Sequence, residues 1–144
     1  MQYGTSGIAD LLGLGDTTPI APIRLAMMIE EGLPVTSLDG VAQAVAPEDP
    51  NFRYRIVPRA TLMRRMRQPD GRLSPEESGR LARLASIWAF AREVWGDDSD
   101  AREFLFRKHP LIEMRLPIDV ILGSDVGAGV VEQILGRLKY GTAA

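Results

Sequence analysis

Arginine residues are concentrated in one segment of the chain. Between Arg53 and Arg72 there are seven arginines and one acidic residue, Asp70, so this segment carries a net charge of +6. Because the whole chain carries −2, the remaining residues carry −8. Clustered guanidinium groups displace counterions from a polyanion whatever the total charge of the protein. The pattern indicates a phosphate-binding surface, and two alternatives stay open: a solvated basic face, or arginines paired with the protein's own acids.

Within this segment, PRATLMRRMRQ (residues 58–68) predicts a short helix with proline at its start. Such a helix would present guanidinium and hydroxyl groups together, and these contact phosphates and guanine edges in protein–DNA complexes. The DNA-contact candidates are Arg59, Thr61, Arg64, Arg65 and Arg67.

Groups suited to catalysis are few. Glu76 and Glu77 are adjacent, but they fall in the first turn of a predicted helix, where capping and the helix dipole stabilise negative charge. The one histidine, His109, is predicted to be an exposed loop residue, with no cysteine and no second histidine as a partner. We therefore assign no catalytic residue and expect neither a metal site nor a cofactor.

The glycines of GSDVGAG (residues 123–129) do not match a nucleotide-binding loop. The spacing is not G-x-G-x-x-G, and no Lys-Ser or Lys-Thr pair follows. Small residues at these positions instead favour close approach of another helix or of a partner chain.

Proline starts and glycine stops divide the first half of the chain into short helices. Residues 1–18 are rich in Gly, Thr and Ser and are predicted to be a loose arm, in which only IADLLGL could dock. One helix is predicted from Pro22 to about Gly32, and a second over residues 37–46, capped by Thr36 or Ser37. The segment NFRYRIV (residues 51–57) alternates apolar and arginine residues, so a short strand remains one interpretation.

The second half has a stronger helical pattern. Ser74, Pro75 and Glu77 form a capping-box sequence, which predicts a central helix of about 20 residues that ends at Gly96. Three further helices are predicted in AREFLFRK, LPIDVIL and SDVGAGVVEQILGRLKYG. Helical spacing puts two sets of apolar residues on buried faces: Leu81, Leu84, Trp88, Ala91 and Trp95 in the central helix, and Val130, Val131, Ile134, Leu135 and Leu138 in the last.

The bulk composition indicates a globular all-α protein. Hydrophobic residues make up 45% and charged residues 25% of 144 positions, which is ordinary for one compact unit. No apolar run approaches the ~20 residues of a membrane-spanning helix, and the N-terminus lacks the basic start and apolar core of a secretion signal. We expect a cytoplasmic protein without membrane association.

The order of these motifs resembles the Xre/MbcA/ParS family of bacterial type II antitoxins. The resemblance covers all but the N-terminal arm and rests on EEGLP, RATLMRRM, GRLSPEESGRLARLASIWAFAREVWGD, AREFL, LPIDVIL and GAGVVEQILGRLKYG. It implies a helix-turn-helix-like domain over residues 19–72, packed on a toxin-binding domain over residues 73–144. The stretch APEDPNFRYRIV is richer in proline and arginine than a regular first helix of that motif, which leaves open a degenerate DNA-binding half or one used for dimer contacts.

The resemblance also implies a function. Members of this family neutralise a RES-domain toxin that resembles ADP-ribosyltransferases and consumes NAD, and they regulate their own operon by binding operator DNA. The last helix is expected to block the toxin's active site, with Arg137, Lys139 and Tyr140 as contacts and Ile134 and Leu138 as apolar support. The alternative for Tyr140 is that it closes the antitoxin's own core.

We expect a homodimer that forms a heteromeric complex with the toxin. Two rival functions remain: a stand-alone helix-turn-helix transcriptional regulator without a toxin partner, and a small enzyme that uses His109.

Overall fold

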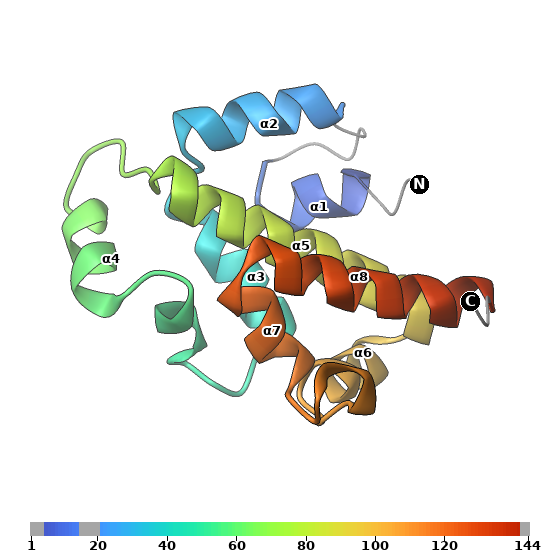
Figure 1. Ribbon diagram of the computed structural model, residues 1–144. Helices are drawn as coiled ribbons and strands as arrows, with labels where there is room; N and C mark the ends of the chain where they lie inside the picture. Colours follow the sequence, from blue (N-terminus) through green and yellow to red (C-terminus); the bar gives the residue numbers. More distant parts are fainter. Residues whose placement is uncertain (1–4, 15–20, 142–144) are drawn as a thin grey trace.

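The computed structural model of the protein describes residues 5–14 and 21–141, and all regular secondary structure within them is helical (Figure 1). The predicted all-α class is confirmed. In chain order the elements are α1 (Thr5–Leu11), α2 (Pro22–Glu31), α3 (Ser37–Val45), the 3₁₀ helix η1 (Phe52–Arg55), α4 (Arg59–Met66), α5 (Pro75–Trp95), α6 (Asp98–Leu105), the 3₁₀ helix η2 (Pro110–Ile112), α7 (Pro117–Gly123) and α8 (Asp125–Tyr140).

Helix α5 begins with the predicted capping box. The Ser74 hydroxyl accepts a hydrogen bond from the Glu77 backbone N–H (3.0 Å), and the Glu77 carboxylate accepts one from the Ser74 N–H (2.9 Å). Pro75 occupies the first helical position, where no backbone donor is needed. Gly96 ends the helix in the left-handed conformation (φ 88°). Both ends of α5 are thus set by local sequence.

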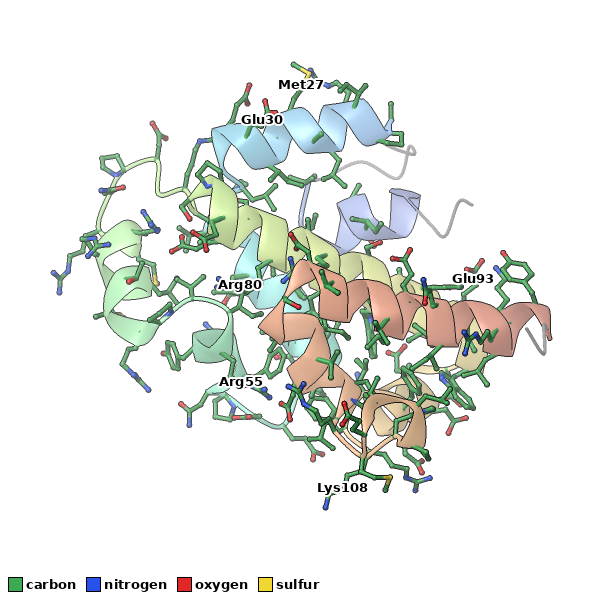
Figure 2. The ribbon with its side chains drawn as sticks, in the orientation of Figure 1. Met27, Glu30, Arg55, Arg80, Glu93 and Lys108 are labelled. Atoms are coloured by element: carbon green, nitrogen blue, oxygen red, sulfur yellow. The ribbon has the colours of Figure 1, made fainter. Side chains whose placement is uncertain are left out.

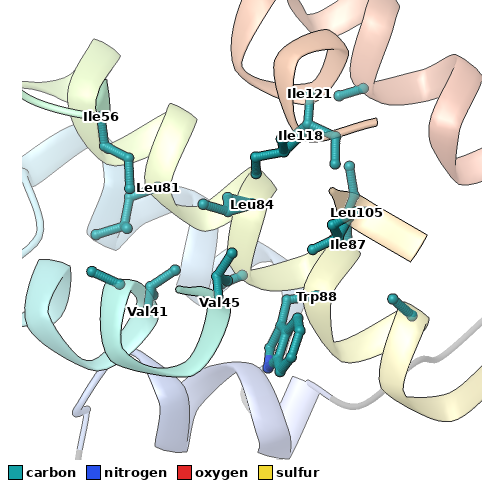
Figure 3. Close-up of a cluster of buried hydrophobic side chains, with 14 of the residues drawn as sticks. Val41, Val45, Ile56, Leu81, Leu84, Ile87, Trp88, Leu105, Ile118 and Ile121 are labelled. Carbon is teal, nitrogen blue, oxygen red and sulfur yellow. The ribbon is translucent and has the colours of Figure 1, made fainter. Parts of the chain in front are cut away.

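The core of the molecule surrounds α5, which contacts α1, α2, α3, α6, α7 and α8. Figure 3 shows how its side chains meet Val41 and Val45 of α3 on one side and Ile118 and Ile121 of α7 on another. Because α5 is covered from several directions, its apolar residues extend well beyond one stripe. The buried set is Ser78, Leu81, Ala82, Leu84, Ala85, Ile87, Trp88, Phe90 and Ala91.

Two predicted buried stripes are wrong at their ends. Trp95, placed on the buried face of the central helix, is 40% exposed because it lies at the last residue of α5, beyond the tightest part of the core. In α8, Val131, Ile134 and Leu135 are buried, whereas Val130 and Leu138 are exposed. Periodicity alone does not show where a neighbouring element stops covering a helix.

The prediction of a loose arm is wrong for residues 5–14. Helix α1 packs against α5 and α3, and Ile8, Ala9 and Leu12 are buried. The Ser37 hydroxyl donates a 2.6 Å hydrogen bond to the Leu12 carbonyl and so fixes this segment. Of the two predicted caps of α3, Thr36 occupies the N-cap position, but its side chain forms no capping hydrogen bond. The apolar spacing of IADLL is therefore sufficient to dock one helical turn. The rest of the predicted arm lies outside the described residues.

The segment at residues 51–57 is a 3₁₀ helix followed by a turn, so the strand interpretation is wrong. Phe52, Ile56 and Val57 are buried, and the arginines between them lie toward the surface. A tight helical turn achieves this separation without strand partners, which no described residue supplies.

Candidate functional site

Helix α4 lies at one end of the molecule, and the C-terminal end of α8 lies at the opposite end (Figure 1). Only Leu62 of α4 is buried, so this short helix is attached to the body mainly by one apolar side chain and by one ion pair, Arg65–Glu77. The connection from α3 to α4 covers residues 46–58 and contains η1, which makes it longer than the 3–4-residue turn of a standard helix-turn-helix. Because α4 and the end of α8 lie at opposite ends of the molecule (Figure 1), the two predicted sites are separate surfaces.

Arg65, a predicted DNA contact, is held inside the chain. Its guanidinium Nε lies 2.8 Å from Glu77 Oε1 and its Nη2 lies 3.2 Å from Oε2, a two-point pair. The two side chains are 22% and 12% exposed. This pair links α4 to the capping box of α5, so Arg65 positions α4 and offers little to an external phosphate.

The carboxyl group of Glu77 has a lowered pKa. Burial by itself would raise this pKa, but hydrogen bonds from Arg65 and from the Ser74 backbone, together with the charge of Arg65, outweigh it. Glu77 is therefore a structural carboxylate, which confirms the predicted capping role. Its neighbour Glu76 is solvent-exposed and lies 3.8 Å from Arg80.

Other arginines of the basic segment also bind within the protein. Arg53 pairs with Asp39 (2.7 Å), Arg55 pairs with Asp119 (2.5 Å), and Arg72 donates to the Gly32 carbonyl (2.8 Å). The open alternative of pairing with the protein's own acids therefore applies to Arg53, Arg55 and Arg65, whereas Arg72 is bound by a backbone carbonyl.

The remaining predicted DNA contacts point outward or lie at the edge of α4. Arg59 stacks on the Tyr54 ring, with its guanidinium carbon 4.1 Å from the ring centroid, and Thr61 is half-buried. Arg64 and Arg67 are exposed, and neither side chain forms an ion pair with a described residue. The surface offered to a polyanion thus consists of Arg64 and Arg67, with Arg59 held beside them.

Helix α8 is fixed at its N-terminal end by a cap and a close packing contact. The Ser124 hydroxyl accepts from the Gly127 N–H (2.9 Å). A Cβ atom on Gly127 would lie 2.5 Å from the Val120 carbonyl oxygen of α7, so only glycine fits there. Predicted helix packing at GSDVGAG is confirmed at Gly127, whereas a Cβ on Gly123 or Gly129 would meet no described atom within 4 Å.

The C-terminal turn of α8 projects beyond the core. Leu138 is 49% exposed, Tyr140 is 55% exposed, and Arg137 is exposed beside them. At that exposure Tyr140 does not close the chain's own core, which was the alternative for this residue. Ile134 is buried, so it anchors α8 and cannot itself touch a partner. Gly141 ends the helix in the left-handed conformation (φ 62°).

Lys139 is held in place by two residues that sequence reasoning missed. Its Nζ lies 3.0 Å from a carboxylate oxygen of Glu93 and 5.8 Å from the centroid of the Phe90 ring, both on α5. Figure 2 shows Glu93 beside the C-terminal part of α8. The hydrogen bond and charge of Glu93 raise the pKa of Lys139, so the ammonium stays charged. Residues 46 positions apart give no sequence signal for this contact.

The groups considered for catalysis do not converge. His109 is half-buried, not exposed as predicted, because its ring packs edge-on against Phe104 (centroids 6.0 Å apart). Its Nδ1 accepts a hydrogen bond from the Leu111 N–H (3.1 Å). Within residues 5–14 and 21–141, no three acidic or histidine side chains are grouped so that they could hold a metal ion. The contacts of His109 with Phe104 and Leu111 thus give it a structural role.

The fold and its two surfaces define an all-helical protein that has a basic helix, α4, in its N-terminal half and an exposed helix end, that of α8, at its C-terminus. Residues 24–86 match the antitoxin Xre-like helix-turn-helix domain, and residues 90–141 match the antitoxin Xre/MbcA/ParS C-terminal toxin-binding domain. A curated relative, antitoxin Xre of Yersinia enterocolitica (serotype O:8 / biotype 1B), is 32% identical over 116 residues, 78% of this chain and 76% of the relative. The chain therefore belongs to the Xre/MbcA/ParS family of antitoxins.

The matched ranges place the two surfaces in different domains. Helix α4 belongs to the helix-turn-helix match and α8 to the toxin-binding match, while α5 runs through both. Among the described helices, none is long and apolar enough to cross a membrane.

Proposed function

We propose that this antitoxin neutralises a RES-domain toxin encoded beside it by placing the end of α8 in the toxin's NAD-binding cleft. The observation that carries the proposal is the exposed turn with Arg137, Leu138 and Tyr140, which lies within the segment matched by the toxin-binding domain. In this proposal the chain acts by binding and has no catalysis of its own.

The chemistry of the α8 end suits a dinucleotide cleft. A site for NAD must accommodate a negatively charged pyrophosphate and flat rings, and cationic and aromatic side chains are suited to both. Lys139 Nζ lies 5.4 Å from the centroid of the Tyr140 ring, so a charge and an aromatic surface are presented side by side. Bound in the cleft, the Lys139 ammonium and the Tyr140 ring would exclude the dinucleotide, and neither would react.

We further propose that the protein forms a homodimer and represses its own operon through α4. Helix-turn-helix proteins commonly bind two half-sites as symmetric dimers, so a second copy would place a second α4 on the same face of DNA. The exposed Arg64 and Arg67 support contacts to phosphates or guanine edges. NAD and operator DNA are both cytoplasmic, which is where we propose that the complex acts.

Co-expression with the adjacent gene tests the toxin part of the proposal. A RES-type product should deplete NAD and stop growth when expressed alone, and both effects should disappear when this antitoxin is co-expressed. The two proteins should also co-purify as one complex.

A stand-alone transcriptional regulator is the second candidate, favoured by the free arginines of α4. If no adjacent RES-type product binds this chain, while operator-like DNA does, the regulator is the better account. Measurable turnover that disappears on His109→Ala would instead revive the enzyme.

A further inference from the structure

A groove of about 380 Å³ lies between the end of α5, α6 and the end of α8. We call it the aromatic groove and define it by Trp95, Phe104, His109 and Leu138, with charged residues of α6 and its following turn at the rim. Phe104 forms its floor: the ring centroid lies 6.0 Å from that of Trp95 and 6.0 Å from that of His109. Three rings and one leucine thus create an apolar hollow open to solvent.

Local contacts keep the walls of the aromatic groove in place. Trp95 is the last residue of α5, directly before the Gly96 stop, so the helix end holds its side chain outside the core. The hydrogen bond from the Leu111 N–H to His109 Nδ1 fixes the imidazole on the opposite side of Phe104. A pocket whose walls are already ordered costs little conformational entropy when it is filled.

Packing within the described residues does not explain why Trp95 is exposed. Trp95 and Leu138 both line the groove and are 40% and 49% exposed, whereas most other apolar residues of α5 are buried. Exposed tryptophan in a formed pocket is characteristic of the residues that dominate protein–protein binding energy. The groove therefore fits an apolar group supplied from outside this part of the chain.

We infer that the aromatic groove is a second docking site for the toxin and receives one bulky apolar side chain of it, beside the contact made by the end of α8. This inference rests on the proposed function. It adds an affinity site to the occluding end of α8, so binding strength and active-site blockage are contributed by different residues.

Continuity with the toxin-binding domain identifies the occupant. Every residue that lines the groove lies within residues 90–141, the toxin-binding match, and Leu138 belongs both to the groove and to the exposed end of α8. The rim carries Asp100, Glu103, Arg107 and Lys108, which is the polar border expected around an apolar interface centre. A toxin that covers the α8 end would cover the groove with the same face.

Fluorine NMR on the native sequence tests the inference directly. The chain has two tryptophans, of which Trp88 is buried and Trp95 is exposed. Antitoxin labelled with 5-fluorotryptophan should show one resonance that shifts between H₂O and D₂O, assigned to Trp95 by its loss in Trp95→Phe. In the complex with unlabelled toxin, the solvent shift of Trp95 should disappear. A Trp95 resonance that keeps its solvent shift in the complex overturns the inference.

Binding measurements with a matched control give the second test. Trp95→Ala should weaken toxin binding about 30-fold, the usual effect of truncating a central aromatic contact. Met27→Ala removes an apolar side chain of similar exposure (43%) from α2, on the far side of the molecule from Lys108 at the groove rim (Figure 2), and should change the affinity less than about twofold. Equal effects of the two variants would contradict a specific groove.

The outcomes separate the groove from the proposed function. If the complex forms and inhibits the toxin but Trp95 stays exposed, only the groove is wrong. If no complex forms with the adjacent RES-type product, the proposed function fails, and the groove fails with it. Should Trp95→Ala not fold, the fluorine measurement on the native chain still decides.

Discussion

In the basic segment (residues 53–72), four of the seven arginines are bound by the protein itself, and the exposed cations are Arg64 of α4 and Arg67 directly after it, with Arg59 beside them. The end of α8 differs: the cation Lys139 is tied to Glu93, and the aromatic Tyr140 and the aliphatic Leu138 are exposed next to Arg137. A surface of free charges binds a polyanion with strong salt dependence. A surface of exposed apolar groups around a fixed charge binds another protein.

This difference indicates that residue type alone does not assign a role. Both α4 and the end of α8 carry cations, yet Arg64 forms no ion pair with a described residue, whereas Lys139 lies between Glu93 and the Tyr140 ring. Variants that change one surface and spare the other separate the two roles.

Removing the end of α8 should have the largest effect. Deletion of residues 139–144 takes away Lys139 and Tyr140, and we expect NAD consumption by the toxin to return to the uninhibited rate even where a complex is still isolated through the aromatic groove. Operator binding should be unchanged, because α4 lies at the other end of the molecule. Full inhibition by the shortened chain would refute the role of this helix end.

Arg64→Ala combined with Arg67→Ala should weaken operator binding at least about tenfold and lower its salt dependence by about two phosphate contacts. Toxin inhibition should not change. Gel-shift titrations at several salt concentrations measure both quantities. Unchanged affinity and salt slope would mean that α4 does not contact DNA.

Arg65→Ala is the matched variant on the same helix. Because Arg65 is paired with Glu77, its loss should reduce the free energy of unfolding by about 1–3 kcal/mol, measured by urea denaturation. Any loss of DNA affinity should disappear once the folded fraction is corrected for. A direct loss in the fully folded protein would return Arg65 to the set of DNA contacts.

Gly127→Ala should destabilise the α7–α8 packing by roughly 1–3 kcal/mol, because the new methyl group overlaps the Val120 carbonyl. Gly129→Ala, where the space is open, should be neutral or slightly stabilising, since alanine favours helix by up to about 1 kcal/mol. Thermal unfolding of the two variants makes the comparison. Equal melting temperatures would show that α8 is not anchored at this contact.

The smallest effect concerns the pH dependence of the α4–α5 link. Glu77→Gln should cost about 1 kcal/mol at pH 7, because the amide can still cap the Ser74 N–H but loses the charge that pairs with Arg65. Since the pKa of Glu77 is lowered in the folded protein, its contribution is complete above the ordinary value of about 4.5 and is lost as the pH falls through the folded pKa. The stability difference between the two proteins should therefore shrink in acid. A difference independent of pH would contradict the assignment.

The parts of the fold that could be predicted from the sequence are those set by local chemistry. Proline, serine and glycine fix the ends of α5, and the Gly141 stop fixes the end of α8, because each acts within its own turn of backbone. Helical spacing also predicts four buried positions of α5, Leu81, Leu84, Trp88 and Ala91. The further buried residues Ile87 and Phe90 lie off that stripe and are covered by other helices, which spacing alone does not show.

The misses depend on distant contacts. Trp95 has the spacing of a buried residue but lies where the core ends, and Arg65 has the composition of a DNA contact but meets Glu77, which is 12 positions away. Likewise, the partner that fixes Lys139 is Glu93, on another helix. Pattern reasoning identifies surfaces by residue type, whereas the division of each surface into bound and free groups requires the folded chain.

If the end of α8 enters the toxin's nucleotide cleft as proposed, crosslinking from this helix end will locate it there. The photoreactive residue p-benzoylphenylalanine in place of Tyr140 should, in the complex, form crosslinks to toxin peptides that line the NAD-binding cleft, and NAD analogues should not compete once the complex has formed. Crosslinks confined to the antitoxin itself, or to toxin peptides outside the cleft, would contradict the account.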